Sequence, residues 1–399
     1  MSPVPICPPG GGSSTRIYHL LRELSRKHEI RLFSQPRLRY LRARAFEREV
    51  VESATYYERR HTSLLAAAAS EWCHRGWINP QAVLSSSCMR VRPPALLDEW
   101  LRWADLALIE FPWQFAYCRR AAPTLPMVFM SHNVEVLTRS GNAQAAGVSV
   151  RRSPLLRLVR RQEEYALVRA DLVLTVCDED RRYFVERHGI AEDRIFTIPN
   201  GSDTKRLFPI EAEAKPELRS QLGLPRASTV VFLSGTPKVP DLEGVKWVRR
   251  LARRLPGVSF VILGGISARP FREDNVIGTG RVADHRPYLQ AADISLSPIE
   301  HGGGTKLKVF DGLAAGLPSI VFDETIRGTE LRDGEHVVVA EKTEPALESA
   351  VRRFLGDPAR ASAIGSAGRR FVVEKHDWED IGRTLDDVLS EFFGGASRR

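Results

Sequence analysis

Cysteine is scarce in this sequence: there are five cysteines among 399 residues, and no two are closely spaced. A disulfide framework needs paired cysteines, and a structural zinc site needs clustered Cys and His ligands. The sequence therefore argues against both and favours a reducing compartment, with the cytoplasm as the expected location. The five residues are Cys7, Cys73, Cys88, Cys118 and Cys177.

Long hydrophobic runs are missing as well. No stretch of the sequence approaches the ~18 consecutive apolar residues of a membrane-spanning helix, and the N-terminus has no basic segment followed by an apolar one. We therefore expect any contact with a membrane to be peripheral, at its inner face. The sequence also lacks short repeats and low-complexity tracts.

Negative charge is outweighed by positive charge. The 58 Lys and Arg residues exceed the 49 Asp and Glu residues, which gives a net charge of +9 at pH 7. This excess favours anionic partners such as nucleotide diphosphates or acidic lipid headgroups. Arginines interleaved with aromatic residues from Arg37 to His61 are interpreted as a solvated helix face, with a surface for an anionic acceptor or lipid headgroup as the alternative. Nucleic acid is not an expected partner, because no recognition motif accompanies the span.

The chain is longer than the roughly 100 to 200 residues of a typical domain, so two domains are expected. In both halves, short apolar runs alternate with helical patterns, which is typical of parallel sheets flanked by helices. A segment rich in proline and turn residues, from Pro199 to Pro225, separates the two series. The expected strands cover 30–32, 106–109, 127–130, 172–176, 229–233, 258–263, 276–277, 294–296, 319–322 and 337–340; expected helices include 13–28, 242–253, 306–315 and two more divided around 376–378.

A glycine loop runs directly into a predicted helix at His301-Gly-Gly-Gly-Thr-Lys-Leu-Lys-Val-Phe-Asp311, after the apolar run 294–296. Backbone amides at a helix start, two nearby lysines and a carboxylate about two turns later suit a diphosphate with a hydroxyl-bearing group behind it. A flexible loop before an ordinary helix would look similar, so the loop needs support from other segments. The pattern predicts a nucleotide-sugar site.

Three further polar segments are predicted to lie at strand ends. Parallel sheets bind their ligands at the carboxyl ends of the strands. The glycines at 10–12 precede the first helix, 131–135 follows one strand, and 234–238 follows another. The second of these segments contains His132. A histidine bonded to backbone is the commoner outcome for any one of ten histidines, but the place of His132 at a strand end favours a functional role.

An acidic triplet, Asp178-Glu179-Asp180, has the spacing of metal-binding carboxylates. The triplet opens a predicted helix that ends at Gly189, and carboxylates in a first helical turn stabilise the helix dipole. We therefore expect no metal site here, no metal dependence and no separate cofactor.

Seven motifs occur in a fixed order along the chain: a Gly-rich opening with Arg16, His132-Asn-Val-Glu135, Ala170 to Cys177 with Asp180, Pro199-Asn200-Gly201 with Phe208, Gly278 to Leu289, Gly302 to Gly316, and Trp378. Together they resemble the family-4 retaining glycosyltransferases of the GT-B fold over nearly the whole chain. The resemblance implies an α/β protein of two Rossmann-like domains, each a doubly wound parallel sheet, that face a central cleft. It implies an acceptor-side domain at 1–205, a nucleotide-sugar-binding domain at 206–375, and a C-terminal helix at 376–399 that crosses back to the first domain.

The resemblance also implies roles for single residues. His132 would lie against the donor sugar, Asp311 would hold the ribose hydroxyls, and the base would be bound near Arg281. The glycines at Gly11 and Gly12 would let the backbone approach the donor phosphates closely. The amides of Gly303, Gly304, Thr305 and Lys306 would meet the diphosphate, and Lys238 and Lys306 would neutralise its charge.

The implied reaction moves a sugar from a nucleoside diphosphate sugar to an acceptor hydroxyl with retention of the anomeric configuration, in polysaccharide, glycolipid or natural-product biosynthesis. Negative charge develops on the diphosphate as it departs, and amides and lysines fixed beforehand stabilise that charge in the transition state. In this family the departing phosphate oxygen is thought to take the proton of the acceptor. His132 would then position and polarise the sugar without acting as a nucleophile.

The sequence departs from the family pattern in two places. Many relatives carry two glutamates with seven residues between them, and here those positions hold Gly303 and Asp311, so that a compensating role of Glu300 stays open. Only nine residues precede the first glycine, and four of them are prolines, which cannot donate to a sheet. The first strand of the family is therefore expected to be missing, through a misassigned start or a truncation at Met1.

Two other classes of protein remain as alternatives. A catalytically weak nucleotide-sugar-binding or assembly partner would follow from the substituted acid pair and the missing strand. A dinucleotide-dependent oxidoreductase would need Gly-x-Gly-x-x-Gly between a first strand and a helix, and neither glycine loop supplies it.

Overall fold

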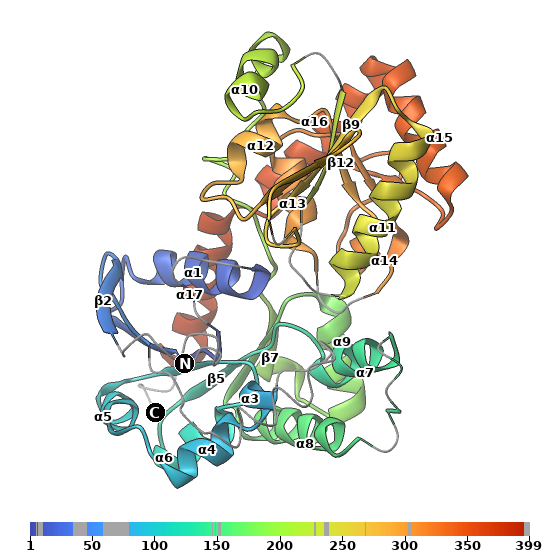
Figure 1. Cartoon of the computed structure of the whole chain (residues 1–399). Coiled ribbons are helices and arrows are strands. Elements are labelled where there is room, and N and C mark those ends of the chain that lie inside the picture. The colour runs from blue at the N-terminus through green and yellow to red at the C-terminus, as the bar shows by residue number, and fades with distance from the viewer. Residues whose placement is uncertain are drawn as a thin grey trace. The chain divides into compact units, whose positions relative to one another are not determined.

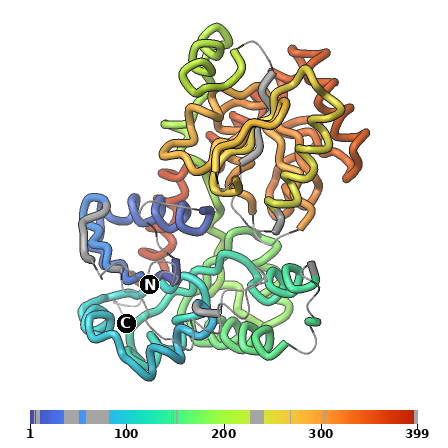
Figure 2. Tube along the Cα trace, viewed as in Figure 1, coloured from blue at the N-terminus to red at the C-terminus, as the bar shows by residue number. Residues whose placement is uncertain are grey.

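The computed structural model divides into two compact units, one formed by Met1–Pro199 with Gly382–Arg399 and the other by Asn200–Ile381 (Figures 1 and 2). Each unit packs helices around a sheet of mainly parallel strands, so the predicted α/β fold with two Rossmann-like units is confirmed. The structure describes residues 1–4, 6, 11–34, 46–58, 80–145, 147, 149–150, 153–226, 229–234, 239–267, 269–301 and 305–394.

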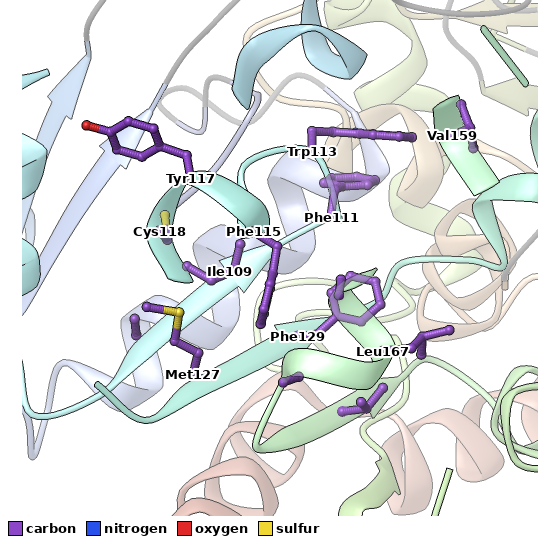
Figure 3. Close-up of a cluster of buried hydrophobic side chains, with 14 of the residues drawn as sticks. Ile109, Phe111, Trp113, Phe115, Tyr117, Cys118, Met127, Phe129, Val159 and Leu167 are labelled. Atoms are coloured by element: carbon purple, nitrogen blue, oxygen red, sulfur yellow. The ribbon is translucent and has the colours of Figure 1, made fainter. Parts of the chain in front are cut away.

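Four parallel strands form the main sheet of the first unit, in the order β4 (Ala107–Glu110), β5 (Met127–Met130), β6 (Leu172–Thr175) and β7 (Ile195–Thr197). All residues of β5 and β6 are buried, as expected for parallel strands covered on both faces. Aromatic and aliphatic side chains from β4, β5 and the adjoining helices fill the core (Figure 3). The helices of this unit are α1 (Gly12–Leu24), α3 (Pro80–Val83), α4 (Ser85–Val91), α5 (Ala95–Trp103), α6 (Phe115–Ala121), α7 (Glu135–Ala145), α8 (Pro154–Arg169) and α9 (Asp178–His188), with a 3₁₀ turn at Glu192–Arg194.

A second, three-stranded sheet in the first unit corrects one expectation. In it β1 (Ile30–Ser34) pairs parallel with β3 (Ala54–Glu58), which pairs antiparallel with β2 (Phe46–Val51). The interpretation of Arg37–His61 as a helix face is therefore wrong for 46–58; the rest of that span lies outside the described residues. The cause is the aromatic and β-branched residues between the charges, which favour strands, and the fully buried Tyr56 is one of them.

Met1 and Ser2 hydrogen-bond to both sheets of the first unit. The Met1 amine donates to Leu108 O (2.8 Å), Glu110 N–H donates to Met1 O (2.9 Å), and Ser2 N–H donates to Phe33 O (2.9 Å). Among the described residues, this two-residue pairing is the only strand-like structure that precedes α1.

The first helix begins and ends earlier than predicted. Gly11 precedes α1, and the hydroxyl of Ser14, inside the first turn, accepts from Gly11 N–H (3.0 Å), so neither Ser13 nor Ser14 is the N-cap. The helix ends at Leu24, four residues before the predicted end.

The last helix, α17 (Trp378–Gly394), contributes its residues from Gly382 onward to the first unit, where it lies against α1 (Figure 1). A side chain at Gly382 would bring its Cβ within 2.3 Å of Glu23 Cβ, so the close approach of the two helices requires glycine. Asp386 binds Lys27 Nζ (2.7 Å) and His28 Nε2 (2.6 Å) at the end of the same contact.

The second unit contains a seven-stranded sheet in the order β10-β11-β9-β8-β12-β13-β14, in which only β10 runs antiparallel to its neighbour. The strands are β8 (Thr229–Ser234), β9 (Val258–Leu263), β10 (Phe271–Glu273), β11 (Val276–Gly280), β12 (Ile294–Ser297), β13 (Ser319–Val321) and β14 (Val338–Val339). The helices are α10 (Lys215–Gln221), α11 (Val239–Arg254), α12 (Arg286–Ala291), α13 (Leu307–Ala314), α14 (Asp323–Ile326), α15 (Glu344–Gly356) and α16 (Pro358–Lys375), with a 3₁₀ turn at Ala212–Ala214.

The strand order defines a switch point in this sheet. The chain passes from β8 to β9 and β11 on one side, then returns to β12 on the other side of β8 before continuing to β13 and β14. In open α/β sheets, ligands bind outside the carboxyl ends of the strands at the point where the direction of winding changes. That point lies between β8 and β12, and the loop after β12 leads into α13.

Candidate functional site

His132 lies in the loop between β5 and α7, and its side chain is buried. Its Nε2 is 2.6 Å from Oε2 of Glu110, the last residue of β4. Because β4 and β5 are parallel neighbours, their carboxyl ends bring the two residues together. The ring of Phe111 stacks on the imidazole with the ring centroids 4.1 Å apart and the planes 5° from parallel.

The segment around His132 is fixed by buried polar contacts. Ser131 N–H donates to Leu174 O on β6 (2.8 Å), and the carboxyl of Glu163 on α8 accepts from the amides of Glu135 (2.6 Å) and Val136 (3.2 Å) at the start of α7. Burial, with the nearby charge of Glu135, raises the pKa of Glu163 to about 8. The loop that carries His132 is thus held on both sides by hydrogen bonds.

Arg16 connects α1 to the end of the main sheet of the first unit. Its guanidinium is buried and donates to Ile198 O and Pro199 O, both at 2.7 Å. Burial lowers the pKa of Arg16 to about 10, and the charge of Glu110 opposes that shift. At the start of the same helix, Gly11 is partly exposed and Gly12 is exposed.

In the second unit, Asp311 lies on α13 with two polar neighbours. Its Oδ1 accepts from Ser202 Oγ (2.7 Å), and its Oδ2 is 3.7 Å from His285 Nε2. Burial acts against the charged imidazole of His285 most strongly of all, but the hydrogen bond and charge of Asp311, together with the charge of Asp284, outweigh it and raise the pKa of His285. A negative group that already interacts with one hydroxyl and one imidazole is suited to accept further hydrogen bonds from hydroxyls.

Thr305 and Lys306 lie where the loop after β12 enters α13. Thr305 Oγ1 accepts from Asn200 Nδ2 (2.8 Å), and Asn200 O accepts from Nδ1 of the buried His376 (2.7 Å). Lys306 is the N-cap residue of α13, with extended backbone angles. Asn200 of the Pro199-Asn200-Gly201 motif therefore contacts the start of α13 directly.

The structure brings some of the predicted donor-binding residues together. Thr305, Lys306 and Asp311 share α13 and its N-terminus, and the loop after β11 that begins with the exposed Arg281 reaches Asp311 through His285. The others predicted for the second unit, Lys238, Gly303 and Gly304, lie outside the described residues. His132, Gly11 and Gly12 belong to the first unit.

Glu300 precedes the glycine loop and is bound within the second unit. Its Oε1 accepts from the indole N–H of Trp247 on α11 at 2.5 Å. Lys308, on the first turn of α13, pairs with Asp241 on the first turn of α11. These contacts attach the start of α13 to α11.

Four residues of these clusters were not named among the predicted site residues: Glu110, Phe111, Ser202 and His285. Glu110 could have been found from the sequence, because it is an acidic residue directly after the apolar run 106–109. His132 was singled out for the same reason, since it follows the run 127–130. Ser202 follows the Asn200-Gly201 motif, but no local pattern links it to Asp311, which is 109 residues away. His285 is likewise joined to Asp311 only by the fold.

The acidic triplet 178–180 opens α9, which ends at Gly189 with a left-handed backbone (φ 64°), as predicted. Within the part of the chain that the structure describes, no three or more His, Cys, Asp or Glu side chains are grouped so that they could hold a metal ion. The helices in that same part include none with the length and apolarity needed to cross a membrane.

Solved structures with this fold span nearly the whole chain. Sucrose-phosphate synthase from Thermosynechococcus elongatus matches with a TM-score of 0.73 and 16% identity, covering 96% of this chain and 94% of that protein. Anabaena Alr3699/HepE in complex with UDP and glucose matches with a TM-score of 0.68 and 14% identity, covering 98% of each chain. The chain has the GT-B glycosyltransferase fold.

Family models and curated relatives give the family. A model described as Glycosyltransferase Family 4 matches residues 10–206, and one described as Glycosyl transferase-like matches residues 243–387. The chain belongs to the family-4 glycosyltransferases.

Two curated relatives show the range of similarity. A GDP-mannose-dependent alpha-(1-6)-phosphatidylinositol monomannoside mannosyltransferase of Mycolicibacterium smegmatis is 28% identical over 240 residues, 55% of this chain and 62% of that protein. A D-inositol 3-phosphate glycosyltransferase of Xylanimonas cellulosilytica is 26% identical over 280 residues, 65% of this chain and 66% of that protein. The chain thus spans slightly less than two thirds of the length of these relatives.

Proposed function

We propose that this protein transfers a sugar from a nucleoside diphosphate sugar to an acceptor hydroxyl with retention of the anomeric configuration. The observation that carries the proposal is the position of α13: its N-terminus follows β12 at the switch point of the second sheet, and its Asp311 lies beside Ser202 and His285. Helix N-termini bind phosphate groups, and ionised carboxylates bind hydroxyls. The diphosphate of a nucleoside diphosphate therefore suits the N-terminus of α13, and its ribose hydroxyls suit the carboxylate of Asp311.

The roles we propose for single residues are those that the resemblance to the family implies. Asp311 accepts from the ribose hydroxyls, and the base is bound next to Arg281. The backbone amides of Gly303, Gly304, Thr305 and Lys306, together with the side chains of Lys238 and Lys306 and the close backbone at Gly11 and Gly12, bind the diphosphate. His132 contacts the donor sugar from the first unit.

In the proposed reaction the bond between the anomeric carbon and the phosphate oxygen breaks, and a bond forms between that carbon and the acceptor oxygen. The proton of the acceptor hydroxyl moves to the departing phosphate oxygen. Since this oxygen gains negative charge, donors that are fixed before the reaction stabilise the transition state more than the ground state. We propose that the reaction needs neither a metal ion nor a dissociable cofactor.

The relatives suggest which substrates to test first. One acts with GDP-mannose on a phosphatidylinositol mannoside, one acts on D-inositol 3-phosphate, and HepE was solved with UDP and glucose. We propose an acceptor that carries a phosphate or lipid phosphate, since the net charge of +9 favours anionic partners. An acceptor of this kind would be consistent with peripheral contact at the inner face of a membrane.

A turnover assay tests the proposal. Release of UDP or GDP from a panel of nucleotide sugars is measured with inositol 3-phosphate, phosphatidylinositol vesicles or no acceptor. We expect acceptor-dependent release from one donor that is lost in His132→Ala and kept in His188→Ala, a control at the end of α9. Tight nucleotide binding without release from any pair would favour the binding or assembly partner, for which the Gly303 position and the engaged Glu300 are the supporting observations.

A further inference from the structure

Two consecutive residues, Glu110 and Phe111, contact the same imidazole. Side chains of consecutive strand residues point to opposite faces of a sheet, so they do not normally meet one partner. Here the strand ends at Glu110, and Phe111 has a left-handed backbone with φ 66°. This turn directs both side chains to His132; Figure 3 shows Phe111 in the loop beyond the strand that carries Ile109.

The left-handed conformation at Phe111 is unfavourable for a bulky side chain. Only three non-glycine residues of the described chain have a positive φ, and the other two, Glu52 and Asp274, occupy the turns of β-hairpins. Such backbone outliers are concentrated at functional sites, where the surrounding structure holds them in place. Phe111 is buried, with 5% of its surface exposed, so its contact with His132 is part of the packed interior.

The carboxylate of Glu110 determines which nitrogen of His132 carries its proton. A carboxylate oxygen 2.6 Å from Nε2 accepts a hydrogen bond, so Nε2 holds the hydrogen and Nδ1 is the second functional atom. Among the described residues, none hydrogen-bonds to Nδ1 of His132. The hydrogen bond that one ring nitrogen of a histidine makes, often with a carboxylate, sets the tautomer of the ring.

Positive groups accompany the buried Glu110. Burial lowers the pKa of Arg16 to about 10 and also lowers the pKa of the Met1 amine, and the negative charge of Glu110 opposes both shifts. The Met1 carbonyl also accepts from Glu110 N–H. Positive groups thus offset the negative charge of Glu110. Hydrogen bonds hold both the backbone and the side chain of this residue.

We propose that Glu110 and Phe111 are positioning residues for His132: Glu110 fixes the tautomer, Phe111 fixes the plane of the ring, and Nδ1 is presented to the donor sugar. The inference rests on the proposed function, in which His132 contacts that sugar. If the pair were only a structural contact of the core, substitutions in it would change stability and leave turnover per folded molecule unchanged.

The test compares kcat, KM for the donor and nucleotide affinity in the full chain. In Glu110→Ala we expect kcat to fall about 10- to 100-fold, by comparison with the loss seen when the carboxylate partners of metal-ligating histidines are removed. Nucleotide affinity should stay the same, because the nucleotide-binding residues lie on other elements. Glu110→Gln, which keeps an accepting oxygen and the shape, should recover part of the loss and carries the test if Glu110→Ala fails to fold.

A double-mutant comparison separates positioning from direct action. In the His132→Ala background, Glu110→Ala should cause no further loss of kcat, because residues that act through one partner are not additive. Phe111→Leu should lower kcat more than Phe184→Leu, a control at a fully buried phenylalanine on α9. In ¹⁵N-histidine spectra, His132 should show the Nε2–H tautomer in the wild type and a mixture of tautomers in Glu110→Ala.

The outcomes distinguish this inference from the proposed function. Full turnover in His132→Ala would remove His132 from the reaction and with it this part of the proposed function. Loss of turnover in His132→Ala with unchanged kcat and tautomer in Glu110→Ala and Phe111→Leu would overturn the positioning role alone.

Discussion

Asp311→Asn is the substitution that examines nucleotide binding most closely. Asn keeps the size and one accepting oxygen, so the 2.7 Å bond from Ser202 Oγ can remain and the fold should be retained. The lost feature is the negative charge that would accept from the ribose hydroxyls. Hydrogen bonds to a charged group contribute about 1.5–3 kcal/mol, and 1.4 kcal/mol corresponds to a factor of ten, so we expect the Kd for UDP or GDP to rise about 10- to 100-fold.

Thermal or chemical denaturation with nucleotide measures this change. At a nucleotide concentration of 100 times the wild-type Kd, binding stabilises the wild type by about 2.7 kcal/mol, and a variant with a 100-fold higher Kd by only about 0.4 kcal/mol. Asp357→Asn is the matched control, because Asp357 caps α16 through Arg360 N–H and asparagine caps equally well. Equal nucleotide-dependent stabilisation of wild type and Asp311→Asn would refute the assignment of Asp311 to the ribose.

Three further predictions concern stability, pH and metal. Gly312→Ala places a Cβ 2.6 Å from Ser295 Oγ and should lower the free energy of unfolding, measured in urea, by about 1–3 kcal/mol. Gly356→Ala, whose Cβ would meet no atom within 4 Å, should be neutral or stabilising. Equal effects of the two substitutions would contradict the packing of α13 on β12. The folded-state pKa of Glu163 is raised from 4.5 to about 8, so folding takes up a proton in that window and wild-type stability should fall there as pH rises. In Glu163→Gln, the free energy of unfolding from denaturation curves should not show this fall between pH 5 and 8.5. An equal fall in wild type and Glu163→Gln would refute the role of Glu163. EDTA treatment should leave turnover unchanged, and a loss restored by a divalent cation would show that the reaction needs a metal.

Much of the fold follows from local sequence patterns. The runs 127–130 and 258–263 were predicted with the bounds that β5 and β9 have, because buried parallel strands are continuous apolar segments flanked by polar ones. The failures have physical causes too. In 46–58, charged residues concealed a strand pair, and at α1 the helix begins at Gly12 because Ser14 bonds back to the Gly11 amide from within the first turn.

The candidate site was less accessible from the sequence than the fold. Strand ends can be located from the pattern, which is why His132 was singled out, whereas Asp311 was singled out because it follows the glycine loop by about two helical turns. Their partners depend on tertiary neighbours: Glu110 meets His132 because β4 pairs with β5, and Ser202 meets Asp311 across 109 residues. The left-handed backbone of Phe111 has no sequence signal, because nothing but the surrounding structure makes a phenylalanine adopt it.

The central claim is that the start of α13 and its Asp311 bind the diphosphate and ribose of a nucleotide sugar. Hydrogen–deuterium exchange of the wild-type protein with and without UDP or GDP tests it most directly. We predict slower exchange in peptides that cover Thr305 to Ala314 and Arg281 to Arg286 when the nucleotide binds. Nucleotide binding with unchanged exchange in both segments, or with protection confined to other parts of the chain, would contradict the claim.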